Sequence, residues 1–407
     1  VALTETELPL LLPAVDSYSP GPEGEGPLAN IPSWVEKELE TNTMPGYAGS
    51  SWYFLRYMDP HNTDSFCDRK VSDYWNQVDL YIGGTEHAVG HLLYSRMWTK
   101  VLFDLGHIGF DEPFRKLLNQ GMIQGSSRFV FRKKGTQQFI SAGLVAGQEV
   151  DKLHVDVNMV DGVELDTEAF KKWRNNEYAN ASFELENGKY ICGVEVEKMS
   201  KSKFNTVNPD ILVEKYGADT FRMYEMFLGP VDQSKPWDTK GIEGVHRFIK
   251  KLWRLFFDEE KGALYNSEPA SPEALKILHR TIKKIEEDTE RFSFNTAVSA
   301  CMICVNDLAD IKCHSLEVLS PLLVLLTPYA PHVAAELWNA TGNEGSVLDA
   351  RYPVFDAKHV TESSKEYPVS INGKVRTNIS IALDASEEEV SAIVLADTLI
   401  QKWMEGK

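Results

Sequence analysis

The chain has 407 residues, of which 43% are hydrophobic and 25% charged, a composition typical of a globular protein with about two to four domains. Its formal net charge of −18 excludes a protein that holds nucleic acid through overall positive charge, although local basic faces remain open. The five cysteines are few and odd in number, which argues against a disulfide framework; we expect a reducing, cytoplasmic location.

The sequence shows no targeting or membrane-spanning signal. Residues 1–12 lack the basic segment of a signal peptide, and the best apolar run, 319–335, is interrupted by Pro321, Pro328 and His332. Because the chain starts on Val1 rather than Met, we expect a processed or excised polypeptide.

The N-terminal part predicts a connecting segment followed by an α/β region. Residues 1–46 are rich in Pro, Gly and Glu, which is typical of a loop or crossover rather than a domain. An α/β pattern follows over 47–125. Within it, VDLYIGG at 78–84 predicts a short buried strand ending in a Gly-Gly turn, and residues 87–106 have helical periodicity.

The middle of the chain predicts an inserted subdomain and a helix bundle. Residues 126–196 contain short runs of alternating apolar and polar residues, separated by charged and Gly-containing turns, which indicates a small β-containing insertion. The segment 197–240 predicts a polar loop and connecting helices, with helix over 207–229 starting at Asn208. Helical periodicity dominates 241–350 and predicts an antiparallel bundle.

Two features of the bundle have more than one interpretation. Cys301 and Cys304 form a CxxC pair, but apolar residues recur around them at helical spacing, so we favour a buried core helix over a zinc site. Basic residues form either solvated helix faces or RNA contacts in two groups: His246, Arg247, Lys250, Lys251 and Arg254, and then His279, Arg280, Lys283 and Lys284.

The last segment, 365–407, predicts the start of a small α/β domain that is cut short. PVSINGKVRTNISI at 368–381 alternates around Asn372-Gly373, the residue pair of a type I′ hairpin turn. Ser386 and Glu389 then have the spacing of a capping box ahead of an apolar helix.

The string KMSKS at 198–202 is the strongest chemical signal in the sequence. Its two lysines, Lys198 and Lys201, lie three residues apart on a hydroxyl-rich loop before a helix. Lysine binds phosphate as a mobile point charge, and such a loop can close as negative charge develops on a leaving group. A solvated basic loop is the alternative, but the longer string through KFNTVNPDILVEKYGADTFRMY disfavours it.

This extended string resembles the second signature of class I aminoacyl-tRNA synthetases. The resemblance implies an α/β Rossmann-type partial catalytic domain, an all-α anticodon-binding-type helix bundle, and the start of a small α/β C-terminal domain. It also implies ATP-dependent activation of an amino acid, in which the substrate carboxylate attacks the α-phosphate and pyrophosphate leaves. Lys198 and Lys201 would be the catalytic residues that stabilise the transferring phosphates.

Two further segments resemble the leucyl-tRNA synthetases rather than their valine, isoleucine and methionine relatives. They are GYAGSSWYFLRYMDP at 46–60 and VDLYIGGTEHAVGHLLYSR at 78–96. By this resemblance the leucine pocket would involve Ser50, Tyr53, Tyr81, His87 and His91, and ATP would be bound by Gly83, Gly84, Glu86, Lys201 and Ser202. Taken singly, each aromatic could be a core residue, and His87 and His91 a satisfied helix pair.

Parts of the family pattern are absent from this sequence. There is no HIGH motif, since His107-Ile108-Gly109-Phe110 lacks the second histidine, and there is no large editing insertion. We therefore expect the C-terminal half of such an enzyme, inactive alone because half of its phosphate-binding site is missing.

The resemblance also implies partners and cofactors. They are leucine, tRNA-Leu, and ATP with Mg²⁺ as a substrate complex; we expect a monomer with no structural metal and no membrane contact. Two other functions stay open: a stand-alone tRNA-binding module derived from a synthetase, and a sister synthetase for valine, isoleucine or methionine.

Overall fold

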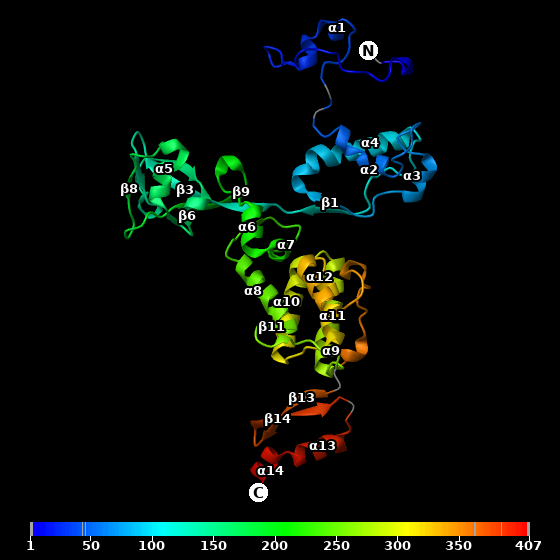
Figure 1. Ribbon diagram of the computed structural model, residues 1–407, viewed down its shortest axis with the longest axis vertical. Helices are drawn as coiled ribbons and strands as arrows, with labels where there is room; N and C mark the ends of the chain where they lie inside the picture. The colour runs from blue at the N-terminus through cyan, green and yellow to red at the C-terminus, as the bar shows by residue number, and fades with distance from the viewer. Residues whose placement is uncertain (1–2, 43, 45, 362–363, 384, 405–407) are drawn as a thin grey trace. The chain divides into compact units, whose positions relative to one another are not determined.

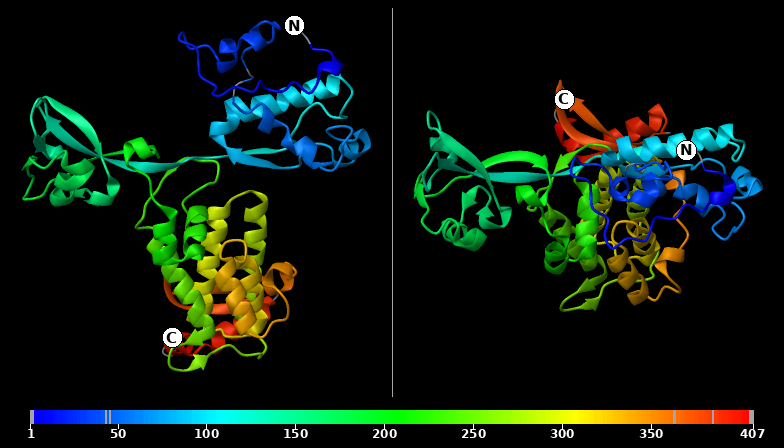
Figure 2. Two further views of the ribbon diagram at one scale, coloured as in Figure 1. Left: turned by 45° about the horizontal axis from the view of Figure 1, so that its top comes forward. Right: turned by 90° about the horizontal axis from the view of Figure 1, so that it is seen from above.

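The computed structural model describes residues 3–42, 44, 46–361, 364–383 and 385–404. It divides into two compact units, Val1–Met122 and Ile123–Lys407, each with its own core (Figures 1 and 2). The expected processing at Val1, and the last three residues of the predicted segment 365–407, lie outside the described residues.

The first unit is an α/β body with one pair of parallel strands. Strands β1 (Tyr81–Gly84) and β2 (Leu117–Gln120) pair from Tyr81 opposite Leu117 to Gly84 opposite Gln120. The helices are α1 (Pro32–Val35), α2 (Tyr53–Tyr57), α3 (Arg69–Trp75) and α4 (Leu93–Asp104). The core consists of Phe54, Leu55, Ile108 and Phe110. Within the predicted connecting segment, Leu28, Ile31 and Trp34 form a second, smaller cluster.

The predictions for 78–106 need correction. The strand begins only at Tyr81 and is not buried, since Ile82 is 47% exposed. A parallel strand is buried on both faces only where helices cover each side of a sheet, and β1 has a single partner strand among the described residues. The helix also starts late, because residues 85–92 form a 3-10 turn and a π turn. The α/β character of the predicted fold class holds, but two strands do not define a Rossmann fold.

The second unit begins with a six-stranded sheet built around the long strand β3 (Figure 2). Its order is β10-β3-β4-β8, and β5 and β9 also pair with β3. The strands are β3 (Ile123–Lys133), β4 (Gln138–Ile140), β5 (Val150–Val155), β8 (Ser182–Glu184), β9 (Gly193–Lys198) and β10 (Lys235–Pro236). A short hairpin, β6 (Val160–Asp161) and β7 (Glu164–Leu165), precedes α5 (Thr167–Asn176). Buried aromatic residues, including Phe139, Phe170, Tyr178 and Tyr190, fill this core.

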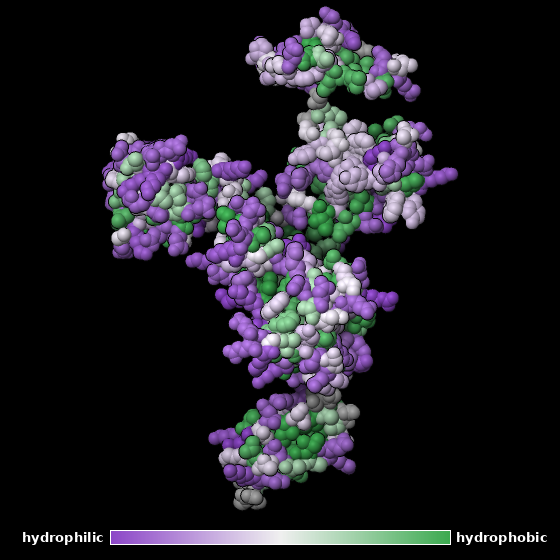
Figure 3. Space-filling view, viewed as in Figure 1, coloured by the Kyte–Doolittle hydropathy of each residue, from purple (hydrophilic) through white to green (hydrophobic). Residues whose placement is uncertain are grey.

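Helices then form one large apolar core, and their visible outer surface mixes hydrophilic side chains with hydrophobic ones (Figure 3). They are α6 (Pro209–Tyr216), α7 (Ala218–Phe227), α8 (Ile242–Phe256), α9 (Pro272–Glu290), α10 (Phe294–Asp310), α11 (Leu316–Leu326) and α12 (Pro331–Ala340). A hairpin of β11 (Phe257–Asp258) and β12 (Gly262–Ala263) follows α8. Asn208 caps α6 as predicted, and the helical stretch predicted over 207–229 consists of two helices, α6 and α7, which are separated at Gly217, whose φ is +88°.

The CxxC pair lies in the core of α10. Cys301 and Cys304 are buried among apolar side chains, and burial raises the pKa of the Cys304 thiol to about 12. The thiolate is the form that binds metal, so this environment disfavours a metal site. The preference for a core helix is confirmed.

The C-terminal segment forms a hairpin followed by two helices. They are β13 (Ser364–Ile371), β14 (Lys374–Ala382), α13 (Glu387–Ala396) and α14 (Thr398–Met404). Asn372 and Gly373 have φ values of +52° and +73°, as a type I′ turn requires. The capping box of Ser386 and Glu389 is present at the start of α13. The two predictions of local structure made for this segment are therefore confirmed.

Candidate active site

A cavity of about 400 Å³ lies within the first unit. It is lined by residues from the segment before α2, from α2, from both strands and from the turns before α4: Tyr47, Ser50, Tyr53, Tyr81, Ile82, Gly83, Gly84, His87, His91, Leu92, Leu117 and Asn119. All five residues predicted to bind leucine are among them, together with Gly83 and Gly84. Aromatic rings with three aliphatic side chains, Ile82, Leu92 and Leu117, and a few polar groups suit a small amino acid with an apolar side chain.

Three side chains in the cavity form a chain of hydrogen bonds. The Tyr53 hydroxyl donates to the Tyr81 hydroxyl at 3.0 Å, and the Tyr81 oxygen lies 2.5 Å from Nε2 of His91. The imidazole ring also stacks on both phenol rings, with centroids 6.2 Å from Tyr53 and 5.9 Å from Tyr81. Each of the three side chains is therefore oriented by the other two.

The protonation state of His91 follows from this environment. Burial, and then the charge of nearby His87, lower the pKa of His91 below its ordinary value. Burial raises the pKa of Tyr81, so that phenol keeps its proton. A neutral imidazole can accept from the Tyr81 hydroxyl, which completes a one-directional chain from Tyr53 to His91.

Local sequence explains how the cavity wall is built. A Cβ atom on Gly90 would lie 2.6 Å from the Tyr47 ring, so glycine is needed for that ring to pack beside His87 and His91. The Ser50 hydroxyl donates to the Tyr47 carbonyl at 3.4 Å, which ties the turn before α2 together.

Glu86 and Asn119 lie differently with respect to the cavity, and the ATP-binding role of Glu86 stays a prediction. Glu86 does not line the cavity; its carboxylate lies against Gly84, where an added Cβ would meet Oε2 at 2.3 Å. Sequence reasoning missed Asn119, whose buried Oδ1 has no hydrogen-bond partner in the described part of the chain. The signal available was its place in LLNQG, at the end of the strand beside β1.

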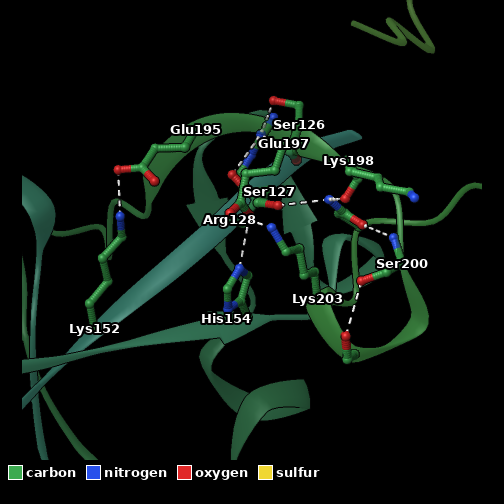
Figure 4. A network of polar contacts seen from close by, with 12 residues as sticks. Ser126, Ser127, Arg128, Lys152, His154, Glu195, Glu197, Lys198, Ser200 and Lys203 are labelled. Carbon is green, nitrogen blue, oxygen red and sulfur yellow. Dashed lines mark hydrogen bonds and ion pairs between the residues drawn. The ribbon is translucent and has the colours of Figure 1, made fainter. Parts of the chain in front are cut away.

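The KMSKS string lies in the second unit, at the end of β9. A short 3-10 turn, Lys201–Lys203, follows Ser200. Lys198, Lys201 and Ser202 are exposed, and neither of these two lysines forms an ion pair with any residue that the structure describes. In Figure 4 the Lys198 side chain points away from the surrounding polar network. Both ammonium groups are thus available to a polyanion.

Asn205 holds the base of this loop. It is 1% exposed, its Nδ2 donates to Oγ of Ser127 and to the carbonyl of Lys198, and its Oδ1 accepts from the amide of Ser200. Gly125 allows this close approach, since a Cβ there would lie 2.6 Å from the Asn205 carbonyl oxygen.

In the stretch 107–110, which lacks the second histidine of a HIGH motif, Ile108 and Phe110 lie in the core of the first unit. Across the described ranges, no group of three His, Cys, Asp or Glu side chains is placed to hold a metal ion. None of the helices in these ranges is long and apolar enough to cross a membrane.

Comparison with known proteins gives a consistent result. Residues 272–392 match the family model for the anticodon-binding domain of tRNA ligase. The leucine–tRNA ligase of Cytophaga hutchinsonii is 56% identical over 405 residues, covering 100% of this chain and 44% of that protein. That of Bacteroides thetaiotaomicron is 55% identical over 423 residues, covering 100% and 45%.

A solved structure matches over nearly the whole chain. It is the Agrobacterium radiobacter K84 LeuRS in a ternary complex with tRNA and LeuAMS, with a TM-score of 0.63 and 27% identity, covering 99% of this chain and 46% of that one. These matches place the chain among the aminoacyl-tRNA synthetases. It belongs to the leucine–tRNA ligase family and spans somewhat less than half the length of the curated relatives that it matches.

Proposed function

We propose that this chain is the part of a leucine–tRNA ligase that supplies a wall of the leucine pocket, the phosphate-binding KMSKS loop and a tRNA-binding bundle. The observation that carries the proposal is the cavity of about 400 Å³, in which the Tyr53–Tyr81–His91 chain orients polar groups beside aliphatic side chains. Identity of 50 to 56% to named leucine–tRNA ligases over the whole chain supports leucine over valine, isoleucine or methionine.

In this proposal the residues divide the chemistry among them. Ser50, Tyr53, Tyr81, His87 and His91 bind and orient leucine, Gly83 and Gly84 allow close approach of the adenosine, and Glu86 accepts from ribose hydroxyls. A leucine carboxylate oxygen attacks the α-phosphorus of ATP, and the bond to the β-phosphate breaks to release pyrophosphate. Lys198 and Lys201, with Ser202, stabilise the phosphate charge. Magnesium enters as the complex with ATP rather than in a protein cage.

The proposed organisation follows the sequence analysis. Residues 1–46 are a connecting segment, 47–125 complete a Rossmann-type catalytic domain, and 126–196 form an insertion in it. Residues 197–240 carry the KMSKS loop and the connecting helices. The bundle over 241–350 binds tRNA-Leu, and 365–407 begin a further domain. The similarity of 272–392 to anticodon-binding domains supports the role of the bundle. We propose a cytoplasmic, monomeric enzyme.

The test is leucine-dependent exchange of pyrophosphate into ATP. The chain is assayed alone and as a chimera in which it replaces the matching C-terminal part of the Cytophaga hutchinsonii relative. We expect exchange with leucine in the chimera only, and none with isoleucine, valine or methionine above background. Exchange by the chain alone would contradict the expected division of the site. An inactive chimera that still binds tRNA would favour a binding module without chemistry.

A further inference from the structure

The three residues that follow the exposed loop, 203–205, each have polar partners elsewhere in the second unit. Lys198 and Lys201 are exposed, whereas Lys203 and Asn205 bond to residues of the sheet and Phe204 bonds to Val157 in the 3-10 turn after β5. Asn205 reaches Ser127 on β3, as described above. Phe204 contacts the inserted subdomain, 126–196, directly, and Lys203 is linked to it through Glu197; the sequence indicated no role for this subdomain.

Phe204 has a backbone conformation that its side chain disfavours. Its φ and ψ are +52° and +30°, in the left-handed region that suits glycine, and a bulky residue stays there only where its surroundings hold it. Its ring packs edge-on against Trp173, with centroids 5.0 Å apart, and the Arg174 guanidinium lies 5.1 Å from its centroid. Its carbonyl accepts from the Val157 amide at 3.0 Å.

Lys203 pairs with the Glu197 carboxylate, which also bonds to a residue of the insertion. The Nζ atom lies 2.7 Å from Oε1 of Glu197, and Oε2 of the same carboxylate lies 2.9 Å from Nε2 of His154 on β5 (Figure 4). The bond from Lys203, followed by those from Ser127 and His154, lowers the pKa of Glu197 to about 2. Glu197 therefore stays ionised at neutral pH, and Lys203 is paired while Lys198 and Lys201 are not.

We propose that the inserted subdomain fixes one end of the phosphate-binding loop, with Phe204 and Glu197 as the positioning residues. The residues that hold them are Trp173, Val157 and His154. Fixing that end limits the conformations from which the loop can close, so that Lys198 and Lys201 meet the phosphates in a productive geometry. The effect on the reaction rests on the proposed function, whereas the effect on loop order does not.

The first experiment measures loop order in the chain itself by amide hydrogen exchange at Ser200, Lys203 and Phe204, whose amides are hydrogen-bonded. Phe204→Gly relieves the backbone strain but removes the ring, and we expect exchange about tenfold faster at these amides. Phe204→Tyr keeps the ring and should resemble the parent. Trp173→Leu removes the partner of the Phe204 ring, and its exchange rates at the three amides should match those of Phe204→Gly. Exchange in the variant that carries both substitutions should be no faster than in either single variant.

A matched control lies on the same strands. Lys152 on β5 and Glu195 on β9 form an ion pair two residues from His154 and Glu197, without contact to the loop. Glu195→Gln should leave exchange at the three amides unchanged, whereas Glu197→Gln should accelerate it. Equal exchange in Phe204→Gly, Trp173→Leu and the parent would overturn the proposal, as would an equal effect of Glu195→Gln and Glu197→Gln.

The second experiment measures catalysis in the chimera. Phe204→Gly and Glu197→Gln should lower kcat for leucine-dependent exchange about tenfold or more, with the KM for leucine within about twofold, since misplacing a catalytic group costs mainly the chemical step. Glu195→Gln should keep the parent kcat. An unchanged kcat in both loop variants would overturn the role in positioning. If the parent chimera is itself inactive, the proposed function fails, and hydrogen exchange alone still decides whether the insertion fixes the loop.

Discussion

The chain of hydrogen bonds in the cavity depends on one imidazole being neutral. His91 accepts from Tyr81 only when Nε2 carries no proton, and the pKa of His91 is lowered by burial and by His87. A histidine whose folded pKa is depressed binds fewer protons than in the unfolded chain between the two pKa values. Its contribution to stability is therefore complete above the unfolded value and decreases as the pH falls toward the folded value.

Replacing His87 should raise the pKa of His91. His87→Asn removes a positive charge that opposes protonation of His91, while burial remains. We expect the NMR titration midpoint of His91 to move upward toward the ordinary histidine value of about 6.5. His107→Asn, on the loop after α4, serves as the control and should leave the midpoint in place. An unchanged midpoint in His87→Asn would show that His87 does not act on His91.

Among the elements, one carboxylate links two helices, α7 and α12, that lie far apart in the sequence. Asp219 on α7 accepts from the backbone amides of His332 and Val333 and from Nδ1 of His332, at 3.3, 2.6 and 2.7 Å. Helix α12 begins at Pro331, and its N-cap residue, Ala330, provides no side-chain cap. Asp219 therefore satisfies amides that the local sequence of α12 leaves unpaired.

Removing this cap should destabilise the bundle. Asp219→Ala leaves first-turn amides of α12 without an acceptor, and we expect a loss of about 1–3 kcal/mol in the free energy of unfolding. Asp219→Asn keeps one acceptor oxygen and should lose less. Urea unfolding of the helical signal compares the three proteins. A change below about 0.5 kcal/mol in Asp219→Ala, the range of ordinary surface substitutions, would show that water caps the helix equally well.

Features that depend on residues close in sequence could be predicted, whereas contacts between residues far apart in sequence could not. The Asn372-Gly373 turn and the Ser386 capping box depend on neighbours within four residues, and both are present. The cap from Asp219 lies 113 residues from its partner in sequence, and Glu197 lies 43 residues from His154. Neither leaves a periodic signal, because each depends on how separate elements pack.

The candidate site shows the same division. Its aromatic residues and glycines were named through a family resemblance, whereas the direction of the Tyr53–Tyr81–His91 chain needs distances that no sequence gives. Asn119 was missed because an asparagine at the end of a strand has no specific pattern. The left-handed Phe204 contradicts the local preference for glycine, and only its tertiary contacts explain it.

For the whole molecule, the question is how a chain of net charge −18 could hold RNA. The two basic groups of the bundle differ in the structure. On α9, Lys283 and Lys284 are paired with Glu287 and Asp288 four residues on. On α8, three exposed residues have no ion pair within the ranges that the structure describes: Arg247, Lys250 and Arg254. Their spacing of three and four residues places them on one face, opposite the buried stripe of that helix.

From this difference we predict that α8 provides the face for the proposed binding of tRNA. Replacing the three α8 residues together by glutamine should weaken binding of a tRNA-Leu transcript and reduce the slope of log affinity against log salt by about one for each phosphate that the variant no longer neutralises. Binding is measured over a series of salt concentrations with the chain alone. The control variant replaces Lys283 and Lys284, the two paired lysines of α9, which also lowers the positive charge of the bundle but leaves α8 intact, and should keep the parent slope. A change in net charge alone would alter the salt slope of both variants in proportion to the number of charges removed. An equal change in slope for each residue replaced, on α8 and on α9, would therefore contradict a binding face on α8.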